Sequence, residues 1–545
     1  MASAPKAPRP TAPLGGGPSR RPGWTKESVP VSPPPAQSIL ILDFGSQYTQ
    51  LIARRLRELA IYAEILPYSA TPETILARSP KGIILSGGPD SVHRKGSPQP
   101  DPEVFRLGLP ILGICYGMQL LVCLHGGAVA PARRREYGHA DLRIQGDSPL
   151  FKGISTRLQV WMSHGDAAQR LNNGFKVLAR TATAPLAAIG DEARRWYGVQ
   201  FHPEVAHTAE GGRILENFAR RICGITQRWT MASLLKSQIA EIKAQVGSQS
   251  VVCALSGGVD SAVAAALIHR AIGRRLHCIF VETGLSRLGD RDRVEKYLGR
   301  ALGLNIKIAD ASALFLRRLA GVSDPERKRK IIGRTFIEVF EAQARRLPDV
   351  AFLAQGTLYP DVIESVSVHG PSAVIKSHHN VGGLPKRMKL KLVEPLRYLF
   401  KDEVRRLGAE MGLPNEILRA HPFPGPGLAI RVLGAVTRQR LDVIRNADAI
   451  LRQELHASGW YDRVWQGFTV LLPVRSVGVM GDSRTYENAV VLRCVGSRDG
   501  MTADWSRLPH DLLQKISSRI VSEVKGVNRV VYDVTSKPPA TIEWE

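Results

Sequence analysis

Three residues of this sequence have the types and positions of a nucleophilic catalytic triad. Cys115 lies in the turn Gly113-Ile-Cys-Tyr-Gly117, between a buried-strand pattern and a helical pattern. Such a turn exposes a nucleophile at a helix N-terminus, where a thiolate is stabilised. His202 and Glu204 follow a later strand pattern. His202 could therefore take the proton from Cys115 while Glu204 orients the imidazole.

Backbone N–H groups near this cysteine could form an oxyanion hole. The segment Ser86-Gly87-Gly88-Pro89 ends another predicted strand, and Gly87 and Gly88 expose their N–H groups there. The N–H of Tyr116 would be a second donor. Each part alone is also typical of core packing or of an ordinary turn. Three parts in order, each at the end of a strand, predict a catalytic site.

A second chemical signal is a glycine loop after the β-branched run that begins at Val251. The loop consists of Ser256, Gly257, Gly258, Val259, Asp260 and Ser261, and a helical pattern covers 262–272. A strand, a glycine turn and a helix N-terminus together favour a bound phosphate. The loop lacks the Lys-Ser/Thr pair of a Walker loop.

An acidic residue in a loop without lysine suits pyrophosphate bound with a divalent cation. The loop therefore predicts cleavage of ATP between its α and β phosphates, with transfer of AMP to an acceptor. The alternative is an ordinary glycine turn between a strand and a helix.

Alternating strand and helix patterns must position both sites. Strands are predicted at 39–42, 82–85 and 110–114 and a helix at 49–59, which is the rhythm of a parallel sheet. A second series has strands at 276–281, 305–308 and 352–354. After the Pro- and Gly-rich segment 421–427, helices at 437–456 and 509–524 accompany strands that we expect to be antiparallel, at 468–474, 489–494 and 530–534.

The predicted fold class is α/β, with two parallel-sheet α/β domains followed by a smaller α+β domain. We place the domain boundaries at 38–227, 228–420 and 421–545. Residues 1–37 are dominated by Pro, Ala, Gly and Ser, so we expect a disordered tail, with a transit peptide as the alternative.

Composition narrows the class of protein. The chain has 545 residues, six widely spaced cysteines and a formal net charge of +25. The cysteines favour reduced thiols in the cytoplasm, and no apolar run is long enough to span a membrane. The positive charge fits either a nucleic-acid-binding face or small polyanionic substrates. Because the basic residues are spread and no nucleic-acid-binding motif is present, we expect nucleotide substrates and no nucleic acid or membrane partner.

Residues 38–227 resemble a class I glutamine amidotransferase. The resemblance implies hydrolysis of glutamine through a thioester at Cys115, with release of ammonia. Met162-Ser-His-Gly-Asp166 matches the loop of that family that contacts bound glutamine. The residues implied in oxyanion and glutamine binding are Gly87, Gly88, Tyr116, Gln119, Ser163 and His164.

The glycine loop, together with Gly356, resembles the N-type ATP pyrophosphatases. Four further segments, 324–333, 375–383, the hinge ending at Arg431, and 536–545, make the whole chain beyond the tail similar to the glutamine-hydrolysing GMP synthase family. The resemblance implies that XMP attacks the α-phosphate of ATP, that pyrophosphate leaves, and that ammonia then displaces AMP to give GMP. It also implies Mg²⁺ on the loop, with Asp260 as its carboxylate, and a homodimer formed through the C-terminal domain.

Further residues are assigned by matching motif. Contacts with XMP are implied for Arg329, Lys537 and Glu543. The adenylylation site and its lid are implied to include Asp361, Glu364, Lys376, His378 and Lys401; solvated side chains on polar loops are the alternative for these. One departure is Glu282-Thr283-Gly284, where the family usually has Asp-Asn-Gly.

Two other functions remain open from the sequence. A glutamine-dependent NAD synthetase would use a related ATP site, although such enzymes usually carry a nitrilase-like glutaminase. A nucleic-acid-binding protein with a degenerate enzyme fold would explain the charge, but both sets of chemical residues are intact.

Overall fold

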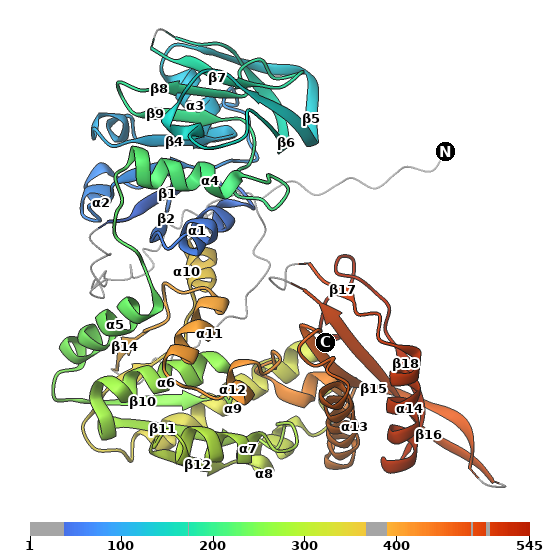
Figure 1. Ribbon diagram of the computed structural model, residues 1–545. Coiled ribbons are helices and arrows are strands. Elements are labelled where there is room, and N and C mark those ends of the chain that lie inside the picture. Colours follow the sequence, from blue (N-terminus) through green and yellow to red (C-terminus); the bar gives the residue numbers. More distant parts are fainter. Residues whose placement is uncertain (1–36, 173, 367–389, 481–482, 498–501) are drawn as a thin grey trace, which may run out of the picture.

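The computed structural model describes residues 37–545 except 173, 367–389, 481–482 and 498–501. The tail predicted at 1–37 therefore lies, apart from Gln37, outside the described residues. Three sheets follow one another along the chain, and Figure 1 shows them as three units. Within the described ranges, none of the helices has both the length and the apolarity needed to span a membrane.

The first sheet joins a parallel half to an antiparallel half. The parallel half has the order β2-β1-β3-β4-β9, and β8, β7, β5 and β6 extend it with antiparallel pairing. Alternate residues of β1 pack against α1 on one face and α3 on the other, which explains its nearly continuous apolar pattern. The bounds are β1 (Ile39–Asp43), α1 (Thr49–Glu58), β2 (Ala63–Pro67), β3 (Gly82–Leu85), β4 (Ile111–Ile114), α3 (Tyr116–Leu124), β5 (Ala128–Ile144), β6 (Arg157–Arg170), β7 (Lys176–Arg180), β8 (Ala188–Asp191), β9 (Trp196–Val199) and α4 (Gly211–Glu216).

The second sheet is parallel throughout, with the order β12-β11-β10-β13-β14. The chain leaves β10 for β11 on one side and later returns to β13 on the other. At such a switch point a crevice opens at the carboxyl end of the central strand. The bounds are α5 (Met231–Val246), β10 (Ser250–Leu255), α6 (Val259–Ile272), β11 (Leu276–Glu282), α7 (Asp290–Arg293), β12 (Ile306–Asp310), α9 (Pro325–Ala344), β13 (Val350–Ala354), α10 (Tyr359–Val366), β14 (Lys391–Val393) and α11 (Lys401–Glu410).

The third sheet is mixed, which corrects one prediction. β15 and β16 pair antiparallel as expected, but β18, predicted to be antiparallel, pairs parallel with β16. The reason is that α14 carries the chain back across the sheet before β18 begins, and a helical crossover joins parallel strands. The bounds are α13 (Arg438–Ala457), β15 (Gln466–Met480), β16 (Ser483–Gly496), β17 (Asp504–Trp505), α14 (His510–Glu523) and β18 (Val527–Tyr532).

A buried ion pair joins the first unit to the second. Arg57 on α1 donates to Glu403 on α11 at 2.9 Å, and both side chains are at most 2% exposed. Arg57 also donates to the carbonyl oxygens of Tyr398 and Ala63. Removing one partner of such a pair typically costs about 3–5 kcal/mol, because the other charge stays buried. This contact therefore fixes α1 against the start of α11.

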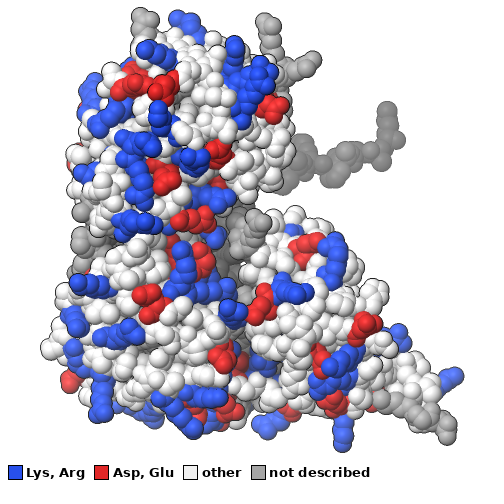
Figure 2. Space-filling model, in the orientation of Figure 1, with Lys and Arg blue, Asp and Glu red and all other residues white. Residues whose placement is uncertain are grey.

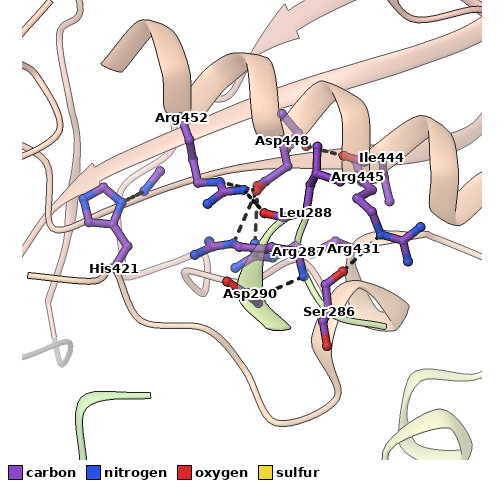
Figure 3. A network of polar contacts seen from close by, with 12 residues as sticks. Ser286, Arg287, Leu288, Asp290, His421, Arg431, Ile444, Arg445, Asp448 and Arg452 are labelled. Carbon is purple, nitrogen blue, oxygen red and sulfur yellow. Dashed lines mark hydrogen bonds and ion pairs between the residues drawn. The ribbon is translucent and has the colours of Figure 1, made fainter. Parts of the chain in front are cut away.

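A second buried network joins the second unit to the third (Figure 3). Asp448, on α13, lies 3.3 Å from Nε of Arg287, 3.1 Å from Nε of Arg452 and 3.7 Å from Nη1 of Arg431. Burial lowers the pKa of Arg287 to about 10; Asp448 opposes that shift, while Arg431 and Arg452 add to it. One carboxylate thus ties α13 to the loop after β11 and to the segment after residue 421.

His421 lies in this junction as a neutral imidazole. Its Nδ1 accepts from the N–H of Gly467 at 3.2 Å, so the proton is on Nε2, which donates to the carbonyl of Tyr461 at 2.8 Å. The imidazole also stacks on the Tyr461 ring at 3.8 Å. Burial lowers the pKa of His421 to about 4.

We expect this histidine to make the junction sensitive to acid. A group whose pKa is lowered on folding stabilises the folded state above its unfolded pKa, about 6.5, and this contribution is lost as the pH falls toward 4. The expected loss is about 2 kcal/mol at pH 5, measured as the fall in unfolding free energy from pH 7. Other groups titrate in the same window, so the comparison is with His421→Gln: if both proteins lose the same stability, the prediction is wrong.

Candidate active sites

The backbone around Cys115 has the conformation of a nucleophile elbow. Cys115 has φ +50° and ψ −105°, a backbone conformation that residues other than glycine rarely adopt. Both neighbouring glycines are required by space. A Cβ on Gly113 would lie 2.5 Å from the backbone of Gly117, and one on Gly117 would lie 2.3 Å from the Leu85 carbonyl oxygen. The Gly-x-Cys-x-Gly pattern is thus explained by the close approach of α3 to β3 and β4.

His202 and Glu204 come together beside Cys115. Nδ1 of His202 lies 2.8 Å from Oε1 of Glu204, and both residues are at most 3% exposed. Burial alone would lower the pKa of His202, but the Glu204 carboxylate and hydrogen bonds with Glu204 and Cys115 raise it well above its usual value. The imidazole is therefore suited to hold a proton next to the sulfur.

The predicted oxyanion segment also lies against this site. A Cβ on Gly87 would lie 3.3 Å from Cε1 of His202, and one on Gly88 would lie 3.0 Å from the Phe44 carbonyl oxygen and 3.2 Å from the Tyr116 ring. A side chain at either position would crowd these neighbours. The Ser86 hydroxyl, which had no predicted role, donates to the carbonyl of Gly87 at 2.8 Å and accepts from the N–H of Phe44.

The segment Met162–Asp166, expected to be a loop that contacts glutamine, lies on a strand. Ser163 and His164 are inside β6, paired with Tyr137 and Glu136 of β5. The Ser163 carbonyl accepts from Sγ of Cys115 at 3.7 Å, and Nε2 of His164 lies 3.0 Å from Glu136. The long β5–β6 hairpin explains the difference, because it extends this half of the sheet across the carboxyl end of β4.

Gln119 and Gln200 link that strand to the nucleophile. Gln119, on α3, donates from Nε2 to the Asp166 carbonyl at 2.8 Å and to Oε1 of Gln200 at 3.4 Å. Gln200 in turn donates from Nε2 to Sγ of Cys115 at 3.6 Å. Gln200 was not predicted as a functional residue. The only indication in the sequence was its position two residues before His202.

The glycine loop lies at the carboxyl end of β10, where the sheet topology opens a crevice. Gly257 has φ +76° and Gly258 is the N-cap residue of α6. The loop is braced by its two serines, since their hydroxyl oxygens are 3.0 Å apart and Ser256 Oγ accepts from the N–H of Gly258. Val259 is the first residue of α6. The N-terminus of a 14-residue helix is thus held open toward the loop.

Asp260 and Lys401 meet at this loop although they are far apart in sequence. Nζ of Lys401, the first residue of α11, lies 2.8 Å from Oδ2 of Asp260. Oδ1 of Asp260 is buried and has no hydrogen-bond partner among the described residues. A Cβ on Gly356 would lie 3.4 Å from the Asp260 backbone, so the second loop passes in van der Waals range of Asp260.

The unpartnered carboxylate oxygen fits a magnesium ion, because Mg²⁺ prefers oxygen ligands and is often shared between one carboxylate and substrate phosphates. Across the ranges that the structure describes, no group of three or more His, Cys, Asp or Glu side chains could hold a metal by itself.

The remaining predicted lid residues are only partly described. Asp361 accepts from the N–H of Leu358 at 3.0 Å and so caps α10. Glu364 is on α10, but its side chain is outside the described part of the structure. Lys376 and His378 also lie outside the described residues. Glu282 belongs to the segment that differs from the usual Asp-Asn-Gly. Its carboxylate accepts from the N–H of Gly284 and stabilises the turn after β11.

The residues predicted to contact XMP lie at the junction of the second and third units. Arg329, on α9, donates to the Glu545 carbonyl, and the neighbouring Lys328 lies 2.5 Å from Oε2 of Glu545. Glu543 accepts from Arg431 at 2.9 Å and from Gln466 at 2.9 Å.

Lys537 is anchored through its backbone, which exchanges hydrogen bonds with Ala503. Lys328 and Arg329 of α9 tie Glu545, and with it the segment 536–545, to the second unit.

Basic residues do not gather into one patch on the face that Figure 2 shows; Lys and Arg are interspersed with Asp and Glu.

Three family models match the chain. "Glutamine amidotransferase class-I" matches residues 40–222, "NAD synthase" matches 231–311 and "GMP synthase C terminal domain" matches 453–544. Each match falls on one of the three units described above. The predicted fold class and resemblance are thereby confirmed.

Similar proteins cover nearly the whole chain. GMP synthase (glutamine-hydrolyzing) of Elusimicrobium minutum is 61% identical over 510 residues, 93% of this chain and 100% of that protein. The protein of the same name from Chlorobaculum tepidum is 60% identical over 516 residues, 93% of this chain and 99% of that protein. Among solved structures, a glutamine amidotransferase of Thermotoga maritima covers 35% of this chain and 98% of its own, at 18% identity and a TM-score of 0.29.

Proposed function

This chain belongs to the family of glutamine-hydrolysing GMP synthases, and from that premise we propose how its two sites divide the reaction. The enzyme uses ATP and the amide nitrogen of glutamine to convert XMP into GMP. Cys115, His202 and Glu204 release ammonia from glutamine, and the loop 256–261 binds ATP, at which XMP is adenylylated. The single observation that supports this division is that the two sets of residues lie at the carboxyl ends of parallel strands in two different sheets.

The first unit performs an acyl transfer. The thiolate of Cys115 attacks the side-chain carbonyl carbon of glutamine, and N–H groups of Gly88 and Tyr116 stabilise the oxyanion. His202 gives its proton to the departing nitrogen, which leaves as ammonia and a thioester remains. A water that gives a proton to His202 then cleaves the thioester to glutamate. Glu204 keeps the imidazole in the orientation that both proton transfers need.

The second unit activates the purine oxygen. That oxygen is a poor leaving group, and its attachment to AMP turns it into a good one. Main-chain N–H groups of the loop 256–261 and the N-terminus of α6 hold the leaving pyrophosphate. Asp260 would hold Mg²⁺ together with the phosphates; the ion, when bound, neutralises the charge that develops on them. Lys401 pairs with Asp260 at 2.8 Å and keeps it in place. By their places in the sequence, Asp361, Glu364, Lys376 and His378 are assigned to the adenylylation step.

The third unit completes the XMP site. We assign Arg329 and Lys537 to the phosphate of XMP and Glu543 to its ribose or purine, since a cation suits the phosphate and a carboxylate accepts from hydroxyl or ring N–H groups. Arg431 holds the Glu543 carboxylate with two nitrogens, at 2.9 and 3.2 Å. This pairing fixes the orientation of Glu543 before the substrate binds.

We also propose that the enzyme is a cytoplasmic homodimer. All six cysteines are free thiols, which suits a reducing compartment. The β15–β16 ribbon exposes apolar side chains that a second copy would cover, with Val479 at 73%, Tyr486 at 58% and Val474 at 54% exposure.

The products of the complete reaction test the proposed function. With XMP, ATP, Mg²⁺ and glutamine, we expect AMP, pyrophosphate and GMP in equal amounts, together with glutamate. Chromatography of the nucleotides and a pyrophosphate assay would check this. Formation of ADP and orthophosphate would contradict the assignment of the loop to pyrophosphate.

A further inference from the structure

Gln200 contacts the nucleophile from a fixed position in the core. It follows directly on β9 and is 1% exposed, and its N–H donates to the Ala187 carbonyl at 2.9 Å. The preceding residue, Val199, accepts from the N–H of Cys115 at 2.7 Å, so the same strand end fixes the nucleophile backbone. These backbone hydrogen bonds thus fix the position of Gln200 relative to the sulfur of Cys115.

The orientation of the Gln200 amide is set by a neighbour. Its Oε1 accepts from Nε2 of Gln119, and its Nε2 donates to Sγ of Cys115 at 3.6 Å. Gln119 is itself anchored on the carbonyl of Asp166 in β6. A flipped amide would bring two NH₂ groups together, so the chain of contacts turns the N–H donor of Gln200 toward the sulfur.

We propose that Gln200 is a further catalytic residue of the glutaminase reaction, whose amide N–H stabilises the thiolate of Cys115. The inference rests on the proposed role of Cys115 as the nucleophile. Sulfur carries negative charge twice in the cycle. It does so before attack, and again when the tetrahedral intermediate of thioester hydrolysis collapses, the C–S bond breaks and the electron pair returns to sulfur as glutamate leaves.

The neutral amide of Gln200 is a permanent hydrogen-bond donor, which His202 is not. The imidazole donates to sulfur only while it is protonated, and it gives that proton to ammonia during each turnover. The Gln200 amide donates at every pH and in every step. It is also already oriented, so that no reorganisation is needed when charge develops on the sulfur.

Gln200→Met tests the proposal, because methionine fills a similar volume without an N–H donor. A hydrogen bond to a charged group corresponds to about a 10- to 100-fold change in rate. We expect glutamine-dependent GMP formation to fall by this factor in kcat, while formation from added ammonium salts stays unchanged. The pH curve for alkylation of Cys115 by iodoacetamide, followed by mass spectrometry of its peptide, should move about one unit to higher pH.

Two further variants make the result unambiguous. Gln200→Glu keeps the acceptor for Gln119 but brings a negative charge to the sulfur, so it should lose more activity than the methionine variant, increasingly as the pH rises. Gln159→Met replaces an exposed glutamine on β6 and should resemble the wild type. If the methionine variant does not fold, the glutamate variant decides by the same two measurements.

Three results would overturn the inference. They are an unchanged alkylation curve and kcat in Gln200→Met, an equal loss with both nitrogen sources, and a glutamate variant that is as active as the wild type. These outcomes leave the proposed function intact, provided that Cys115 is required. If glutamine hydrolysis survives loss of Cys115 itself, the proposed function fails instead.

Discussion

Replacement of Cys115 by alanine is expected to abolish GMP formation from glutamine while leaving formation from added ammonium salts largely intact. Loss of a catalytic nucleophile reduces turnover by about 10⁴-fold or more. The synthetase residues lie on another sheet and should still use free ammonia. Parallel assays of GMP with the two nitrogen sources measure the effect.

Cys123→Ala is the matched control for that variant, because Cys123 lies on the same helix, α3, and faces partly to solvent. It should retain both activities. Position 115 has φ +50°, and alanine is no more strained there than cysteine. An equal loss with glutamine and with ammonium salts would contradict a two-site enzyme.

Asp260→Ala is expected to have the opposite pattern. Removal of the carboxylate takes away the proposed metal ligand and leaves Lys401 without its partner at 2.8 Å. Formation of AMP and pyrophosphate should fall by about 100-fold or more with either nitrogen source, since metal and charge stabilisation act on the departing phosphates. Basal glutaminase activity, measured as glutamate release, should remain.

A matched control is Asp292→Ala, which removes an exposed carboxylate from α7 in the same unit. It should form pyrophosphate at the wild-type rate. If Asp260→Ala still released pyrophosphate normally, the ATP site would have to lie elsewhere. If it also lost glutaminase activity, the two sites would be coupled more tightly than their separate sheets imply.

The local parts of both sites could be predicted from the sequence because neighbouring residues create them. The elbow at Cys115 follows from glycines two residues away on either side, and the loop 256–261 follows from a strand that leads straight into a helix. The alternating patterns likewise predicted β1, β3, β4 and β11 and the helices α1, α13 and α14 within a few residues, but they did not predict β5–β8, α5 or α9. The pairing of β18 could not be predicted, because its direction depends on which way α14 crosses the sheet.

Residue types and their spacing were therefore enough to predict the chemistry: a thiol with its base, and a phosphate loop with its acid. The distant groups that support them are brought in by the packing of separate elements. Lys401 reaches Asp260, Gln200 faces Cys115, and Arg57 pairs with Glu403 because separate elements pack together there. A hydrogen bond or buried ion pair depends on distance and exclusion of water, and residues far apart in the chain acquire both only when the cores between them have formed.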